Sequence, residues 1–340
     1  MNGDRRAAVA RPTLEAVAAR AGVGRGTVSR VINGSPKVSE RARDAVLQAI
    51  DELGYVPNRA ARTLVTRRTD TIALVVSETQ QRLFDEPFFA GIIRGIGSAL
   101  AETGLQLILA MAQSPEEHGR LEQYLTGQHV DGVLLISLHG ADPLPGRLEA
   151  MGVPTVLGGR PVGLDPYSYV DMDNRTGARQ AVKYLLGKGR RRIATIAGPQ
   201  DMFAGVDRLA GYRDALLATG LPEIVAFGDF SEESGMRAMR ELLASHPDID
   251  AVFTASDPMA LGAMRVLREE GRAIPDDVAV IGFDDSSAGA HSSPALTTVH
   301  QPVEAMGRQM AQLLVARING EALKQPVVIL DTHLVTRASA

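Results

Sequence analysis

Four polar side chains between Arg25 and Arg30 are of the types that contact DNA. Arg25 and Arg30 offer guanidinium forks, and Thr27 and Ser29 offer hydroxyl groups. Such groups bind phosphate oxygens and the edges of bases in the major groove. A short helix over this stretch would turn its valine and isoleucine residues inward and leave these four side chains outward. The stretch therefore has the composition of a DNA-reading helix.

Two short helices joined by a tight turn would hold this surface. Apolar residues after Thr13 recur at helical spacing on one face, and the Thr13 hydroxyl can cap the first turn. Gly22 then ends the first helix, Val23 fills the angle, and Gly24 opens the second helix. The segment therefore predicts a helix-turn-helix, for which the alternative is an ordinary helical hairpin with a solvated basic face.

The charge distribution favours DNA as the partner of the head. Residues 1–69 contain 13 Lys and Arg against 6 Asp and Glu, whereas residues 70–340 contain 23 against 34. A basic head gains from counterion release on DNA, whereas an acidic body must bind something else. A nucleotide-binding loop at GVGRG is excluded, because its spacing is not G-x-G-x-x-G and a helix precedes it.

Several classes of site and location find no support in the composition. The 340 residues include no cysteine, and the seven histidines are scattered, so we expect no disulfide, zinc site or cofactor. Signatures of a nucleophile and its base, and of a P-loop, are absent, so we expect no enzyme. Without a signal-peptide core or a membrane-length apolar run, we expect a cytoplasmic, nucleoid-associated protein.

A third helix and a hinge are expected after the reader. Ser39 can cap a helix that ends at Gly54, which closes a small three-helix core. The two-turn helix expected over 59–65 is marginal alone in water. Leu64 lies among arginines, which suits a hinge that folds on DNA and wedges an aliphatic side chain into a minor-groove step. A plain linker is the alternative.

From residue 70 onward, apolar strand-like runs alternate with amphipathic helices, beginning with TIALVVS. This alternation predicts a doubly wound α/β body, and its length favours two lobes with a ligand cleft at the strand ends. We expect a flexible arm at 1–12, a helix-turn-helix headpiece at 13–56, a hinge helix and linker at 57–69, and an effector-binding and dimerisation domain at 70–340, with one lobe at about 70–168 and 301–326 and the other at about 169–300 and 327–340.

Longer motifs run through the whole chain. TLEAVAARAGVGRGTVSRVIN and VSERARDAVLQAIDELGYVPNRAARTL come first, followed by DGVLLIS, VDMDN, RRIATIAGP, RLAGYRDAL, ASDPMALGAMRVL, DVAVIGFDD and LTTVHQP. In these motifs and their order the chain resembles the lactose-repressor (LacI/GalR) family of bacterial transcription regulators. The resemblance implies a periplasmic-binding-protein-like effector domain and a homodimer on a palindromic operator. A small molecule between the lobes would decide whether the hinge helices form.

The resemblance also implies which residues of the head contact DNA. Arg25, Gly26 and Arg30 fall where the family reads bases, and Ala61 and Leu64 match its minor-groove and wedge positions. Arg25 and Gly26 replace the better-known tyrosine–glutamine pair, so the operator cannot be copied from those members, although Arg25 can present its fork to a guanine. We expect DNA contacts from Thr13, Arg25, Gly26, Thr27, Ser29, Arg30, Asn33, Asn58, Arg59, Ala61 and Leu64.

In the body, the resemblance implies an effector site. Arg208 and Asp284 match an effector-binding arginine and acid, and Phe230 falls where sugar-binding members stack an aromatic ring on a pyranose. The alternatives are charges paired with each other and a core phenylalanine. Gly159 replaces a frequent aspartate, which enlarges the pocket or shifts the polar contact to Arg160. We expect effector contacts from Phe84, Phe89, Ser137, Arg160, Arg208, Phe230, Ser256, Asp284 and Gln301.

The effector itself is the least determined prediction. The segments LVVSETQQRLFDEPFFAGI and VDGVLLISLHGADPLP resemble actinobacterial regulators that respond to cellobiose and related β-glucosides. We therefore expect a repressor that sugar releases from DNA and that does not associate with membranes. We expect a dimer, because the sequence shows no apolar heptad tail of the kind that forms tetramers. The alternatives are a regulator with a purine or phosphosugar co-repressor, and a sugar-binding protein that does not bind DNA. One of Phe88 and Phe89 is expected in the core, and Asp257 is expected to order its loop.

Overall fold

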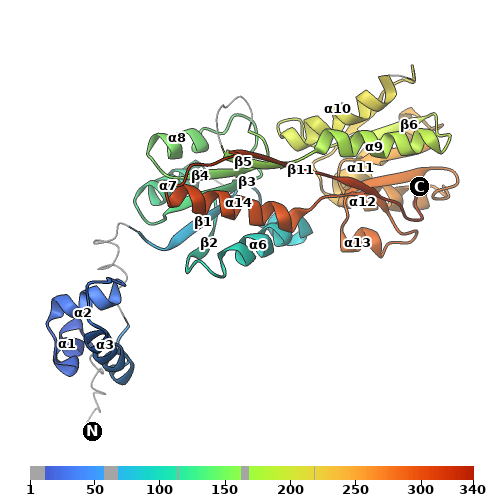
Figure 1. Cartoon of the computed structure of the whole chain (residues 1–340). Coiled ribbons are helices and arrows are strands. Elements are labelled where there is room, and N and C mark those ends of the chain that lie inside the picture. The colour runs from blue at the N-terminus through green and yellow to red at the C-terminus, as the bar shows by residue number, and fades with distance from the viewer. Residues whose placement is uncertain (1–11, 57–67, 113–114, 162–167, 218) are drawn as a thin grey trace, which may run out of the picture. The chain divides into compact units, whose positions relative to one another are not determined.

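The computed structural model describes residues 12–56, 68–112, 115–161, 168–217 and 219–340 (Figure 1). The chain divides into two compact units, Met1–Thr69 and Asp70–Ala340. The predicted arm, apart from Pro12, and the four hinge residues expected to contact DNA lie outside the described residues, namely Asn58, Arg59, Ala61 and Leu64.

The headpiece has the three helices that its sequence predicts. They are α1 (Leu14–Ala21), α2 (Arg25–Ile32) and α3 (Glu40–Leu53). The Thr13 hydroxyl accepts a hydrogen bond from the Ala16 N–H at 3.2 Å, and Gly22 ends α1 with a φ of +65°. Val17, Val28 and Val46 are fully buried at the centre of the three helices. The predicted caps and core are therefore confirmed.

The first lobe of the body is built on a six-stranded, wholly parallel sheet in the order β11-β5-β4-β3-β1-β2. Helices α6 and α14 pack on one face, and α7 and α8 pack on the other. The bounds are β1 Thr71–Val76, α5 Gln80–Asp85, α6 Pro87–Leu100, β2 Gln106–Met111, α7 Pro115–Thr126, β3 Gly132–Ile136, α8 Leu144–Ala150, β4 Thr155–Gly158, β5 Ser168–Met172, α14 Val303–Ile318 and β11 Val327–Leu330.

The second lobe repeats this plan in the order β12-β10-β9-β8-β6-β7, with only β12 antiparallel to its neighbour among the described strands. Helices α11 and α12 cover one face, and α9 and α10 cover the other. The bounds are α9 Asn174–Gly187, β6 Ile193–Ala197, α10 Phe203–Leu217, β7 Ile224–Phe227, α11 Glu232–Ser245, β8 Ala251–Thr254, α12 Asp257–Glu269, β9 Ala279–Asp284, α13 Ser287–Ala290, β10 Thr297–His300 and β12 His333–Val335.

The chain crosses between the lobes three times, after β5, after β10 and after β11. In Figure 1 the red elements α14 and β11 lie among the cyan and green elements of the first lobe. The predicted boundaries at 168/169 and 326/327 were wrong by one strand each. Tyr169 of β5 pairs with Val327 of β11, so both strands complete the first sheet and the crossings follow them. Among the described residues, no helix has both the length and the apolarity to span a membrane.

Candidate functional site

A cavity of about 740 Å³ lies where the strands of both sheets end. Ser137 and Gly159 follow β3 and β4 on its first-lobe side. On its second-lobe side, Phe230 lies beyond the end of β7, and Asp284 ends β9. The carboxyl ends of strands are where α/β sheets bind ligands, and the volume is in the range of small-molecule sites. The predicted cleft is confirmed.

Arg208 is the most deeply buried charge in the cavity wall, with a residue exposure of 5%. Its Nε donates to Asn174 Oδ1 at 2.9 Å, and its Nη1 donates to the Ala255 carbonyl at 2.5 Å. The guanidinium stacks over the Phe283 ring at 3.8 Å. Burial lowers the pKa of Arg208, and the charge of Asp284 opposes this shift. The guanidinium is therefore fixed in orientation before any ligand binds.

Asp284 lies beside Arg208, with 3.7 Å between Oδ1 and Nη1. The same oxygen accepts a hydrogen bond from Gln301 Nε2 at 2.5 Å. Burial raises the pKa of Asp284 to about 7, although Arg208 favours the ionised form. The neighbouring Asp257 is outside the cavity wall and accepts bonds from the Thr298 hydroxyl and the Ser286 N–H. Asp257 therefore orders its loop, as predicted.

Phe230 contributes its ring to the second-lobe wall, and its residue exposure is 8%. Its carbonyl accepts a hydrogen bond from the buried Ser256 hydroxyl at 3.0 Å. Ser256 also caps α12 by accepting from the Met259 N–H. The Ser256 hydroxyl thus has partners within the protein and helps to hold Phe230 in place; Ser256 also lines the cavity, and its effector contact stays a prediction.

Gly198 lies directly against the Phe230 ring. A β-carbon at Gly198 would come within 2.3 Å of Phe230 Cε1, well inside van der Waals contact. We expect Gly198→Ala to push the ring out of place and to weaken effector binding about tenfold, since a stacked ring contributes about 1 kcal/mol or more. Gly97→Ala is the matched control, because a β-carbon there meets no atom within 4 Å. Equal affinities for the two variants in calorimetry would contradict this role.

Arg160 and Gly159 form the adjoining part of the wall. The φ of Gly159 is +99° and its missing β-carbon faces open space, so glycine leaves room where a side chain would be strained. Arg160 extends to the second lobe, where its Nη2 donates to Asp207 at 2.7 Å and its guanidinium covers the Phe203 ring at 4.1 Å. Gly159 therefore enlarges the cavity, and Arg160 joins the two lobes.

Two of the aromatic residues after β1 line the cavity. Phe89, predicted for the effector site, is one of them, although it is 1% exposed and also packs in the first-lobe core. Phe88 is half-buried, lines the cavity and packs edge-on against Phe89 at 5.4 Å. Phe84 is 77% exposed and is not in the wall. Because α5 ends between them at Asp85, Phe84 and Phe88 take different directions, and Phe84 as a contact stays a prediction.

Four functional candidates in the wall escaped the sequence analysis. Asp171 and Asn174 are buried and share a hydrogen bond at 3.2 Å, and Asn174 accepts from Arg208. The motif VDMDN contains both residues, and polar residues at the end of a predicted strand could have identified them as candidates for the site. Arg82 and Glu86 line the cavity from α5 and its end. Only their i, i+4 spacing of opposite charges marked them.

Backbone strain gathers at the same cavity. Six described residues other than glycine have a positive φ, and four of them line the cavity: Ser137, Phe230, Asp284 and Asp285. Such conformations cost about 1–3 kcal/mol each and persist where the surroundings impose them, often at binding sites. The fold therefore holds these side chains at the cavity at some cost in stability.

His139 bridges the lobes beside the cavity. Its Nε2 lies 3.2 Å from Glu78 Oε1, and its Nδ1 lies 2.9 Å from Asp201 Oδ2. Glu78 belongs to the first lobe and Asp201 to the second, and the Gly140 N–H also donates to the Asp201 carbonyl. The bond to Glu78, followed by that to Asp201, raises the pKa of His139 to about 9. Both ring nitrogens of His139 therefore have partners within the protein.

The headpiece presents the predicted reading surface on α2. Arg25, Gly26 and Arg30 are exposed, whereas Thr27 and Ser29 are half-buried. Arg25 lies 3.1 Å from Glu15 of α1, a pair that it would exchange for a base or a phosphate. Two further predicted DNA contacts, Thr13 before α1 and Asn33 after α2, bond to their own segment. The Thr13 hydroxyl caps α1, and Asn33 Nδ2 donates to Ser29 Oγ at 3.4 Å.

Comparisons with known proteins find matches to both the head and the body of the chain. Residues 13–58 match the bacterial regulatory proteins of the lacI family, and residues 182–340 match a periplasmic binding protein-like domain. The HTH-type transcriptional regulator CelR of Thermobifida fusca is 62% identical over 97% of this chain and 98% of its own length. The chain belongs to the lacI family of bacterial regulatory proteins. The family resemblance seen in the sequence motifs is thus confirmed.

Solved structures of the lacI family share the whole architecture. A transcriptional regulator CelR–cellobiose complex is 60% identical, covers 97% of this chain and 100% of its own, and has a TM-score of 0.78. The lac repressor dimer bound to its operator and an anti-inducer is 28% identical, covers 97% and 99%, and has a TM-score of 0.85. This lacI-family protein is therefore a DNA-binding transcriptional regulator with an effector domain.

Proposed function

We propose that this lacI-family regulator is a homodimeric repressor of sugar-utilisation genes that leaves a palindromic operator when cellobiose or a related β-glucoside binds its cavity. The similarity to CelR, and to a CelR structure that contains cellobiose, supports the choice of sugar. The lac repressor dimer on its operator supports the assembly.

The observation that carries the proposal is the pairing, at the cavity, of one buried aromatic ring with the ion pair of buried Arg208 and half-buried Asp284. Phe230 offers a flat apolar surface to the C–H face of a pyranose. Arg208 offers fixed donors, and Asp284 offers a carboxylate acceptor, to the hydroxyl groups of the same ring. A polyol needs this combination of donors, acceptors and a stacking surface.

The charges of the wall favour a neutral ligand over an anionic co-repressor. Four of the five arginines of the wall, Arg82, Arg94, Arg160 and Arg208, each lie within 4.0 Å of a carboxylate, and the fifth, Arg308, is exposed. A phosphosugar would have to compete with these carboxylates for the guanidinium groups and, at Arg82 and Arg208, would leave carboxylates that are largely shielded from water without their partner. A hydroxyl-rich neutral ligand can bond to the ion pairs without separating them.

On the DNA side, the proposal rests on Arg25 and Arg30 of α2, because both are exposed and the pair of Arg25 with Glu15 lies at the surface. The minor-groove roles of Ala61 and Leu64 remain predictions. We expect the logarithm of operator affinity to fall linearly with the logarithm of salt concentration.

The test uses full-length protein and a duplex selected from a randomised library by the protein itself. Cellobiose should lower the affinity for the selected duplex at least about tenfold, as expected for typical allosteric coupling, and the α-linked isomer maltose should not. Fluorescence anisotropy at two salt concentrations measures both effects. Tighter DNA binding with sugar would indicate a co-repressor, and equal affinity for selected and random duplexes would refute the DNA-binding role.

A further inference from the structure

The loop and short helix between β1 and α6 place an ion triplet at the cavity. Arg82 Nε donates to Glu86 Oε1 at 2.7 Å, and Arg82 Nη1 donates to Glu78 Oε2 at 2.7 Å. The side chains of Glu78, Glu86 and Arg82 are 5%, 17% and 20% exposed. Arg82 and Glu86 line the cavity, whereas Glu78 stands behind them. Three charges are thus held out of bulk water at one end of a ligand site.

Other charges fix this triplet from several sides. His139 is bonded to Glu78 from the loop after β3. Asp229 faces Arg82 from the second lobe, and together with Glu86 and Glu78 it raises the pKa of Arg82 although burial opposes the charge. Burial raises the pKa of Glu86. Arg82 is therefore a charged group whose position is set before a ligand arrives.

The triplet keeps hydrogen-bonding capacity on its cavity side. Within the described part of the chain, Arg82 Nη2 and Glu86 Oε2 take part in no hydrogen bond, so the pair keeps one donor and one acceptor for a ligand. Adjacent hydroxyl groups of a pyranose each donate and accept, and they match such a pair. An ion pair with both members present can bind them without an unpaired charge.

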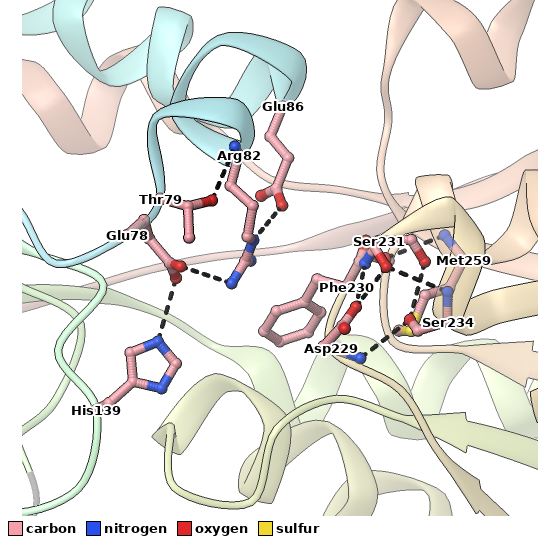
Figure 2. A network of polar contacts seen from close by, with 11 residues as sticks. Glu78, Thr79, Arg82, Glu86, His139, Asp229, Phe230, Ser231, Ser234 and Met259 are labelled. Carbon is pink, nitrogen blue, oxygen red and sulfur yellow. Dashed lines mark hydrogen bonds and ion pairs between the residues drawn. The ribbon is translucent and has the colours of Figure 1, made fainter. Parts of the chain in front are cut away.

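Arg82 and Glu86 are separate from the Arg208 and Asp284 pair in the same cavity. Figure 2 shows Arg82 descending from its helix beside Glu86, with the Phe230 ring on the opposite, second-lobe side of the space. A single ring stacked on Phe230 meets Arg208 and Asp284, and a second linked ring needs its own polar partners. The triplet supplies them from the first lobe.

Resting on the proposed sugar-binding function, we propose that Arg82 and Glu86 are specificity-determining residues that bind the hydroxyl groups of the second sugar ring. They make the regulator respond to a disaccharide and not to a single β-glucoside ring. Glu78 accepts a hydrogen bond from Arg82, and His139 is bonded to Glu78. Neither residue lines the cavity, so both are positioning residues.

The test compares cellobiose with methyl β-glucoside by calorimetry on the full-length protein, with the glucoside measured by displacement of cellobiose. Arg82→Met should weaken cellobiose binding about 10- to 100-fold, as expected for loss of charge-assisted hydrogen bonds. The affinity for cellobiose should then approach that for the glucoside, which should stay within about threefold of the wild-type value. Glu86→Gln keeps an acceptor for Arg82 and should give a smaller loss of the same kind.

Arg147→Met is the matched control, because Arg147 forms an exposed first-lobe ion pair with Glu122 at 2.8 Å and is not in the cavity wall. A cellobiose loss no larger than in this control overturns the inference. So does an equal loss for both sugars with a lower melting temperature, since that marks a purely structural role. If the wild-type protein binds neither sugar, the proposed function itself fails. If the wild-type protein binds cellobiose and the Arg82 and Glu86 variants bind it equally well, only the inference fails.

Discussion

Replacing Arg208 with methionine is expected to abolish the response to sugar while DNA binding survives. Methionine keeps the apolar volume over Phe283 but removes the guanidinium that donates to Asn174, to the Ala255 carbonyl and to a ligand. Loss of charge-assisted hydrogen bonds to the sugar should weaken its binding about 100-fold. The measurements are calorimetry with cellobiose and release of operator DNA by cellobiose.

The same substitution of Arg208 also tests how the cavity supports the fold. Asn174 and the Ala255 carbonyl lose their donor, and Asp284 loses its cation, which together should cost up to about 3 kcal/mol of unfolding free energy. Operator binding without sugar shows that the variant is folded. Arg213→Met is the control, since Arg213 is on the same helix but forms an exposed pair with Glu223. Normal release of the Arg208 variant by cellobiose would refute the assignment of the site.

Sugar affinity is expected to rise with pH through neutrality, because Asp284 must be ionised to accept hydrogen bonds from hydroxyl groups at full strength. Burial raises its pKa to about 7. Between pH 8 and pH 6 its ionised fraction falls from about 0.9 to about 0.1, so the dissociation constant should rise roughly tenfold. Asp284→Asn should bind more weakly at pH 8 and should show a nearly flat profile.

The effect of Asp284 on stability has the opposite sign. A carboxyl group whose pKa is higher in the folded state than its usual value binds protons more tightly when folded, so it favours folding at low pH. The effector-free domain should lose this contribution as the pH rises from about 4 to about 7. Asp214→Asn is the control, because the bond to Arg175 lowers the pKa of the Asp214 carboxyl, which is the opposite direction from Asp284. A wild-type affinity independent of pH would contradict the role of Asp284.

Local patterns predicted the elements of this chain well. The caps at Thr13 and Ser39 and the glycine stops at Gly22 and Gly54 follow from rules that act within one turn of helix, and the structure has all four. The lobe boundaries did not follow from such rules. They depend on the pairing of β5 with β11, two strands far apart in the sequence, and no local pattern encodes that partner.

The cavity was predictable where recognisable motifs supply its wall, as at Phe230 and Asp284 near strand ends and at Arg208 on α10. The sequence did not say which of the adjacent residues Phe88 and Phe89 is the more deeply buried, because neighbouring side chains on a helix point about 100° apart; the structure buries Phe89 in the core, while both line the cavity. Arg82 was missed because an arginine between two acids has the sequence signature of a solvated helix. Only burial of the triplet distinguishes the two cases.

The three crossings have a consequence for how the protein is made. The first sheet receives β11 and its covering helix α14 from the last 40 residues of the chain, although its other strands are synthesised first. A ribosome that has completed the second sheet as far as β10 still carries a first lobe in which α6 alone covers the face that it shares with α14. Chaperone dependence should therefore peak late in translation, and a chain truncated after β10 should aggregate instead of forming a half-active repressor.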